Sequence, residues 1–194
     1  MKKILLSAIV SLFIIPAMTQ ENTYLRMNLE KNKVYRLRSV SEQTVTQTVN
    51  GNQQTVETKS EYTFSVKMLD MTPDFMVTEV HFDTIFINTN TMGKTSTFNS
   101  TVEGDMKSSE TSDIMSCLLN RLSKSALYVK MDFTGKPVEI VNTKMISDMI
   151  LKDTASITLA EPVAAALKTQ IAGMVSHNAL KTMIGGFTWH LPGK

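Results

Sequence analysis

The chain has 194 residues, of which 42% are hydrophobic and 20% charged, with a formal net charge of +2 and a single cysteine. We expect the N-terminal segment with Lys2 and Lys3 to be removed, which leaves 18 of the 20 basic residues against 18 acidic ones. Such a balance argues against nucleic-acid binding, which needs clustered basic side chains. One cysteine also excludes an intrachain disulfide framework.

The N-terminal segment MKKILLSAIVSLFIIPAMTQ has the order of a secretory signal peptide, with a basic start, an apolar run and a short tail of small residues. The apolar run covers residues 4–15, which is shorter than the roughly 20 residues that span a bilayer. We therefore predict a signal peptide at residues 1–19 and export to the periplasm or cell envelope. An uncleaved anchor is the alternative. No later segment resembles a transmembrane helix, so we expect no membrane span after signal removal.

Polar and apolar residues alternate from residue 23 to residue 102, which predicts long antiparallel strands. Residues 34–49 lead to Asn50-Gly51, a pair that suits a two-residue hairpin turn, and the partner strand follows directly. Threonine is β-branched and polar, so the Thr- and Gln-rich part of this hairpin is typical of a strand with a solvated face.

A third long strand is predicted at residues 75–90, after the turn MTPD. Alternation places four apolar residues on one of its faces: Met76, Val80, Phe82 and Phe86. A shorter strand is expected near residues 95–103, after a turn at Gly93.

The second half of the chain changes to a helical spacing of apolar residues. Helices are predicted at residues 113–124, 143–153 and 162–176, with short strands between the first two. Near the C-terminus, Phe187, Trp189 and Leu191 alternate as in a strand that lacks a partner, a pattern that is consistent with truncation of the chain at that end. The predicted fold is one α+β domain at residues 20–194, with a strongly curved, half-barrel-like antiparallel sheet and about three helices packed on one face.

Residues that could carry catalysis are few. Cys117 falls within the apolar stripe of the first predicted helix, where a free cysteine usually behaves as a small buried hydrophobe, although a nucleophile is the alternative. His81, His177 and His190 are far apart and form none of the spacings typical of zinc sites. We therefore predict a non-enzymatic protein without a metal or cofactor.

Methionine is abundant, with 14 residues. A cluster such as Met68, Met71 and Met76 could hold Cu(I), but alternation separates its members, so flexible core filling is preferred. Methionine and phenylalanine can also line a pocket for apolar ligands. The candidate pocket residues between sheet and helices are Phe64, Phe82, Met131 and Met149.

The segments LRMNLEKNKVYRLRSVSEQTVTQTVNG, YTFSVKMLD, MVTEVHFDTIFI and MDFTGKPVEIVNTKMISDMI resemble an uncharacterised family of secreted Bacteroidota proteins. That family has a first strand of the kind L-x-L-x-K-G-x-x-Y, Thr- and Met-rich strands and a G-K-x-x-E-I turn. Here Asn32 stands at the usual glycine, and the chain ends where relatives continue. The resemblance implies no activity. It also brings a possible O-glycosylation pattern, D-[ST]-x, at Thr154 and, less favourably, at Thr84.

Two functions from different classes follow. The first is an envelope protein that binds an apolar or amphipathic ligand between sheet and helices, which requires a sizeable apolar cavity. The second is a structural or interaction module that pairs with an envelope protein through an exposed strand edge, either the Thr-rich strands or the unfinished C-terminal edge. This function requires a filled core and an exposed edge.

Overall fold

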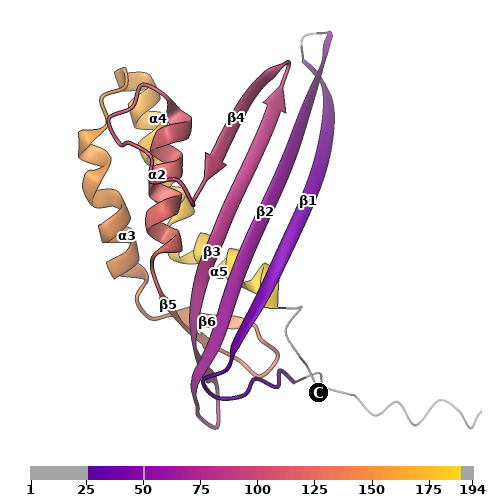
Figure 1. Cartoon of the computed structure of the whole chain (residues 1–194), viewed down its shortest axis with the longest axis vertical. Coiled ribbons are helices and arrows are strands. Elements are labelled where there is room, and N and C mark those ends of the chain that lie inside the picture. Colours follow the sequence, from indigo (N-terminus) through magenta and orange to yellow (C-terminus); the bar gives the residue numbers. More distant parts are fainter. Residues whose placement is uncertain (1–25, 50, 189–194) are drawn as a thin grey trace, which may run out of the picture.

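The computed structural model describes residues 26–49 and 51–188, and the elements named below lie within these ranges (Figure 1). The strands are β1 (Val34–Val49), β2 (Asn52–Met71), β3 (Met76–Thr91), β4 (Lys94–Asn99), β5 (Leu127–Met131) and β6 (Pro137–Ile140). The helices are α2 (Thr111–Ser123), α3 (Thr143–Leu151), α4 (Glu161–Met174) and α5 (His177–Thr188), with a 3₁₀ helix, η2 (Lys152–Ser156), after α3.

The six strands form one antiparallel sheet in the order β1-β2-β3-β5-β6. Strand β4 pairs with the distal part of β3, and β5 pairs with its proximal part. Here distal means the end with the β1–β2 and β3–β4 turns, and proximal the opposite end. Gly51 and Gly93 have φ angles of 80° and 79° in these two distal turns, a conformation that glycine adopts without strain.

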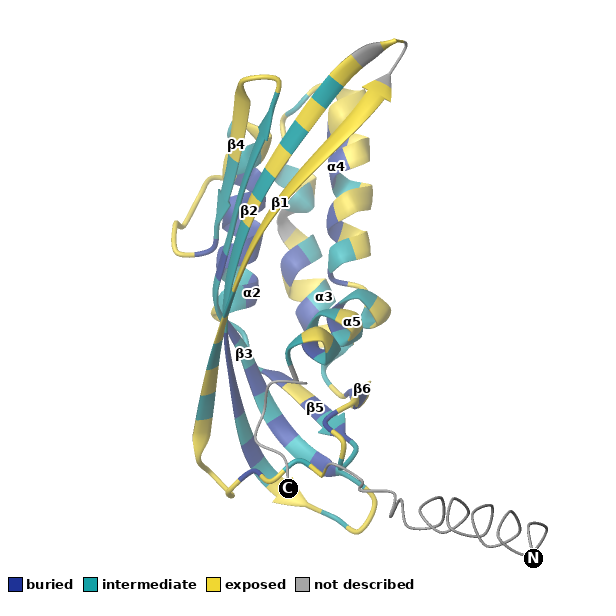
Figure 2. Ribbon diagram, turned by 90° about the vertical axis from the view of Figure 1, so that its right-hand side faces the viewer, coloured by how far each residue is buried: buried dark blue, intermediate teal, exposed yellow. Residues whose placement is uncertain are grey.

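The helices lie on one side of the sheet (Figure 2), which confirms the predicted α+β class with an antiparallel sheet. Four helices are described rather than about three, because residues 177–188 form α5. Phe187 therefore belongs to a helix and not to the strand that its alternation predicted; Trp189 and Leu191 lie outside the described residues. From this helix the Phe187 ring packs on the Phe64 ring of the sheet, with their centroids 5.3 Å apart.

The sheet is open and not strongly curled, so the predicted half-barrel curvature is not confirmed. Strong curvature needs repeated bulges or kinks along neighbouring strands. The β2–β3 pairing has register shifts at two places only, between Thr63 and Ser65 and between Met68 and Asp70.

The first of these shifts changes which face β3 presents to the helices. Val80 pairs with Val66 before it, and Ile85 pairs with Tyr62 after it, so the buried positions change from even to odd numbers. Phe82 is fully buried as predicted, but Phe86 lies opposite Glu61 and is wrongly placed by strict alternation. A bulge that inserts one residue turns every later side chain to the other face.

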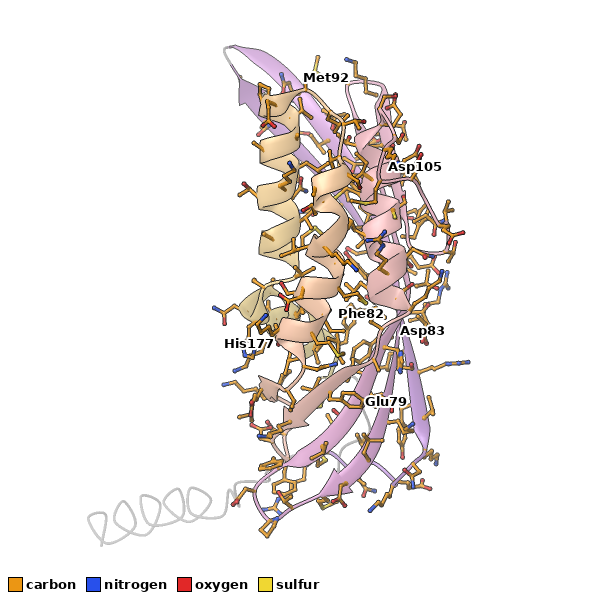
Figure 3. All side chains as sticks on the ribbon, turned by 90° about the vertical axis from the view of Figure 1, so that its left-hand side faces the viewer. Glu79, Phe82, Asp83, Met92, Asp105 and His177 are labelled. Atoms are coloured by element: carbon orange, nitrogen blue, oxygen red, sulfur yellow. The ribbon has the colours of Figure 1, made fainter. Side chains whose placement is uncertain are left out.

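The core lies between the helices and the proximal part of the sheet. Its largest fully buried side chains include Phe64 and Phe82 on the sheet and Ile114 and Ile184 on the helices. The hairpin of residues 40–62, which we call the distal hairpin, extends beyond this core. None of its residues whose exposure is described is fully buried. Phe82 lies at mid-height between sheet and helices, whereas Met92 lies at the distal end (Figure 3).

Candidate functional site

The structure places three of the four predicted pocket residues inside the packed core. Phe64, Phe82 and Met131 have no exposed surface. The rings of Phe64 and Phe82 contact each other at a centroid distance of 5.7 Å, and Met131 lies opposite Met76 in the β3–β5 ladder. Met149 is 39% exposed on α3 and does not join this cluster. These residues therefore meet one another rather than an open space.

An apolar cavity does exist, but it lies among the helices. Its volume is about 20 Å³, which is room for about one water molecule. A lipid-sized ligand would need a space at least ten times larger, since ligand pockets usually measure about 300–1,000 Å³. The lining residues come from α2, α3 and α4, the residue that follows α4, and α5: Met115, Leu118, Leu119, Leu122, Ile150, Ile171, Met174, Val175 and Met183.

The two candidate glycosylation residues are both half-buried. Thr84 lies in β3 opposite Thr63, at the bulge, where the strand backbone is held by its neighbours. Thr154 lies in η2 and its hydroxyl donates a hydrogen bond to the Leu151 carbonyl at 2.8 Å. Thr154 lies outside the sheet, in η2, whereas Thr84 lies within it.

The residues considered for catalysis or metal binding stay apart. Cys117 is buried in α2, as its apolar stripe predicts. His81 contacts Glu79 on the sheet, and the His177 imidazole contacts the Thr143 hydroxyl at 3.1 Å, while His190 lies outside the described residues. Within the described ranges, no three side chains of the metal-ligating types gather into a site.

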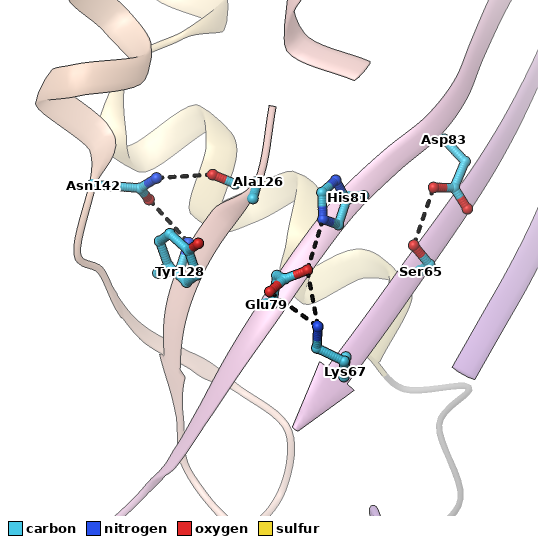
Figure 4. A network of polar contacts seen from close by, with 8 residues as sticks. All are labelled: Ser65, Lys67, Glu79, His81, Asp83, Ala126, Tyr128 and Asn142. Atoms are coloured by element: carbon cyan, nitrogen blue, oxygen red, sulfur yellow. Dashed lines mark hydrogen bonds and ion pairs between the residues drawn. The ribbon is translucent and has the colours of Figure 1, made fainter. Parts of the chain in front are cut away.

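The solvent face of the proximal sheet carries a small ionic network (Figure 4). Glu79 accepts hydrogen bonds from Lys67 at 3.3 Å, and its carboxylate lies 3.0 Å from the His81 ring. The contact with His81, followed by that with Lys67, holds the pKa of Glu79 below its ordinary value, although partial burial opposes this shift. Within this network the Lys67 ammonium balances the charge of the Glu79 carboxylate.

A polar recess of about 560 Å³ opens beside this network, at the bulge in β3. The Ser65 hydroxyl donates to Asp83 Oδ1 at 3.1 Å, and Asp83 Oδ2 lies 3.6 Å from Arg36 Nε without a hydrogen bond. Asn120 and Lys124 from the end of α2 complete the rim. Arg36 lies close enough to balance the charge of Asp83, whose Oδ2 is buried without a hydrogen bond. No signal in the sequence predicted this recess, because the bulge that creates it is invisible to alternation.

Two of the three sheet edges are closed by neighbouring groups. Strand β6 is short and begins with Pro137, which has no N–H to offer, and Lys181 Nζ donates to the Val138 carbonyl at 2.9 Å. Strand β4 is also short, and its Asn99 N–H donates to the Ser116 hydroxyl of α2 at 3.0 Å. Short, covered edges are the usual protection against unwanted pairing.

Strand β1 forms the third edge and lacks this protection. It is 16 residues long and pairs only with β2 in the described structure (Figure 1). Three of its valines are largely exposed, Val34, Val40 and Val45, with exposed fractions of 53%, 47% and 43%. Its charged residues, Arg36, Arg38 and Glu42, all form ion pairs with residues of β2 or β3. The strand therefore presents a long row of backbone groups with little charge to repel a partner.

The sequence predicted an exposed strand edge as one candidate site but could not identify which strand it was. Edge position depends on strand order, which alternation does not reveal. The uncharged run from Thr44 to Val49 was the available signal. None of the helices that the structure describes combines the length and apolar character needed to cross a membrane. Comparison with known proteins finds no matching family model, no matching curated protein and no matching solved structure.

Proposed function

We propose that this chain is an exported, non-enzymatic interaction module of the cell envelope that accepts a partner strand along the edge of β1. The observation that carries the proposal is the contrast between this long, unprotected edge and the short, covered edges of β4 and β6. The signal-like N-terminus and the resemblance to secreted Bacteroidota proteins support the proposed location.

Strand addition uses the features that β1 offers. Alternate residues of an edge strand direct their N–H and C=O groups away from the sheet, so a partner strand gains a ladder of main-chain hydrogen bonds. Side chains on the two faces of β1 then decide which partner fits. The two-sided polar character of the distal hairpin keeps that edge soluble while it is unpaired.

Binding of an apolar ligand is the alternative, and the small room beneath the sheet favours the interaction module over it. Phe64, Phe82 and Met131 fill the space they were expected to line, and the cavity among the helices holds about 20 Å³. A filled core supports the interaction module. A ligand role would require the helices to separate from one another first.

Site-specific photo-crosslinking in the producing cell tests the proposed function. A photoreactive amino acid replaces Val40, which is 47% exposed on β1, and a matched control replaces Val102, which is 51% exposed after β4. We expect a discrete intermolecular protein adduct at Val40 and only background at Val102. Equal labelling at both positions, or crosslinks at Val40 that form only within one molecule, would contradict the proposed edge site.

A further inference from the structure

The partner that the β1 edge fits best is a second copy of this chain. This inference rests on the proposed function and adds the identity of the partner. We propose that two chains associate through antiparallel pairing of their β1 strands about a twofold axis that passes through Val40. The two sheets then become one continuous sheet with an isologous interface.

The charge pattern of β1, together with the length of the overlap, favours this register. The helices of both copies lie on the same side of the joined sheet only if even-numbered residues of one copy lie opposite even-numbered residues of the other. A shift of one residue would place the helices of the two copies on opposite sides. Pairing Val40 with itself places Arg38 of each copy opposite Glu42 of the other. Opposite charges directly across a strand pair stabilise it, and like charges destabilise it.

Neighbouring registers are less favourable. A shift of two residues toward the hairpin turn places Val40 opposite Glu42, and a shift of four places Glu42 opposite itself. Shifting four residues the other way places Arg38 opposite itself. A shift of two in that direction places Arg36 opposite Glu42, but it leaves Arg38 opposite Val40, shortens the overlap to residues 34–44 and loses the Val40–Val40 contact. The proposed register pairs residues 34–46 of both copies and covers the exposed valines of the strand.

The intrachain ion pairs extend this pattern across the interface. Lys59 lies 2.8 Å from Glu42, and Arg38 lies 2.7 Å from Glu61. In the dimer, Lys59 and Glu42 of one copy continue into Arg38 and Glu61 of the other, so that charges alternate in a row across four strands. Arg38 and Glu42 each keep their present partner and gain a second one of opposite sign, whereas Arg36 lies opposite Thr44.

Charge reversal at the edge, measured by analytical ultracentrifugation, tests the pairing. Arg38→Glu places carboxylates opposite each other, and Glu42→Arg places guanidinium groups opposite each other, so each variant alone should self-associate about tenfold more weakly than the wild type. An equimolar mixture of the two variants restores both opposite-charge contacts and should associate about as well as the wild type. The mixture changes neither fold, which separates an interface effect from a folding effect.

Lys59→Gln is the matched control, because it removes the intrachain partner of Glu42 without altering the edge itself. We expect this variant to dimerise within about twofold of the wild type, since exposed ion pairs contribute little. A monomeric wild type at every concentration tested would contradict the inference. So would a mixture of the charge-reversed variants that stays monomeric.

Disulfide trapping tests the register independently. Val40→Cys should form a covalent dimer on mild oxidation, because the two residues would lie within the usual Cα separation of a disulfide. Thr44→Cys should not, since the two sites would be about 27 Å apart. Cys117 is buried and does not compete. Efficient trapping at position 44 with none at position 40 would overturn the register.

The β1 edge as a binding site and the second copy as its partner are tested separately. Photo-crosslinks from Val40 to a different envelope protein, with a monomeric purified chain, would remove the second copy as partner and keep the edge as a binding site. Absence of both crosslinks and dimers would remove both.

Discussion

The proximal and distal parts of the same strands differ in what supports them. In the proximal part, the helix-facing row of β2 is apolar and buried: Phe64, Val66 and Met68. In the distal hairpin, the same row is made of half-buried residues, most of them polar: Gln54, Val56, Thr58 and Ser60. The proximal part of β2 is packed in the core, whereas the distal part is stabilised by strand pairing and β-propensity. The proposed edge function would account for this strand length beyond the core, because strand addition needs a long edge and no packed face.

The largest expected effect comes from emptying the proximal core. Phe64→Ala should lower the free energy of unfolding by about 3–5 kcal/mol, because it leaves a cavity among Phe82 and Phe187. Val45→Ala, on the same face of the distal hairpin, should change it by no more than about 0.5 kcal/mol. Urea unfolding measures both, and similar losses would show that the distal hairpin is not peripheral.

Two glycines with positive φ provide the next comparison. Gly104 has φ 66°, and a Cβ there would lie 2.5 Å from the Asp113 carbonyl oxygen and 2.6 Å from the Cys117 nitrogen. Gly93, in the distal turn, has φ 79° and nothing within 4 Å of a Cβ. We expect Gly104→Ala to cost about 2–4 kcal/mol and Gly93→Ala about 1 kcal/mol in thermal or urea unfolding. Equal costs would mean that the loop before α2 can move away from the helix.

Asn142 extends the proximal ladder beyond the end of β6. Its Oδ1 accepts from the Tyr128 N–H at 2.9 Å and its Nδ2 donates to the Ala126 carbonyl at 2.8 Å, so the side chain takes the place of a strand residue (Figure 4). Asn142→Ala should cost about 1–3 kcal/mol, because two backbone groups lose their partners.

Asn88→Ala is the distal control for this substitution. Asn88 makes a side-chain bond to Thr97 at 2.9 Å. Its loss should cost less than about 1 kcal/mol, since water can replace that contact. If denaturant curves gave the larger loss for Asn88→Ala, the distal pairing would matter more to stability than this account holds.

The smallest effect concerns acid stability. The pKa of Glu79 is lowered from its ordinary value of 4.5, with the His81 contact as the largest cause. The folded state therefore favours the carboxylate, and this contribution is full above pH 4.5 and lost as the pH falls through the lowered pKa. Glu79→Gln should reduce the loss of stability below pH 4.5.

Glu42 provides the exposed counterpart. Its pKa is also lowered, by the hydrogen bond from Lys59, but its side chain is 70% exposed and screened by solvent. At a protein concentration at which the chain is monomeric, Glu42→Gln should leave the acid unfolding profile nearly unchanged. A steeper effect from Glu42 than from Glu79 would reverse the expected order.

The parts of the fold that depend on local pattern could be predicted. Alternation and Asn50-Gly51 located the long hairpin, and the apolar stripe of α2 was confirmed by the burial of Ile114, Cys117 and Leu122. Helix α5 was missed because Gly185 and Gly186 lower helix propensity, and Phe187 also fits an alternating pattern. The packing of α5 against the core outweighs this low helix propensity, since Leu180 and Ile184 are fully buried.

The candidate site depended on information that local pattern does not hold. Phe64, Phe82 and Met131 were correctly expected between sheet and helices, but whether they line a space or fill it depends on the packing of every neighbour. The identity of β1 as the unprotected edge depends on strand order, and the reversal of faces after Phe82 depends on a bulge.

Native mass spectrometry of the mature chain, purified from its own envelope, is the decisive test of partner binding at β1. We expect protein-sized adducts, with a second copy foremost, that are retained in Lys59→Gln and weakened in Arg38→Glu. A reproducible lipid-sized mass released on mild denaturation, from a chain without protein adducts, would contradict it and return the apolar-ligand role to first place.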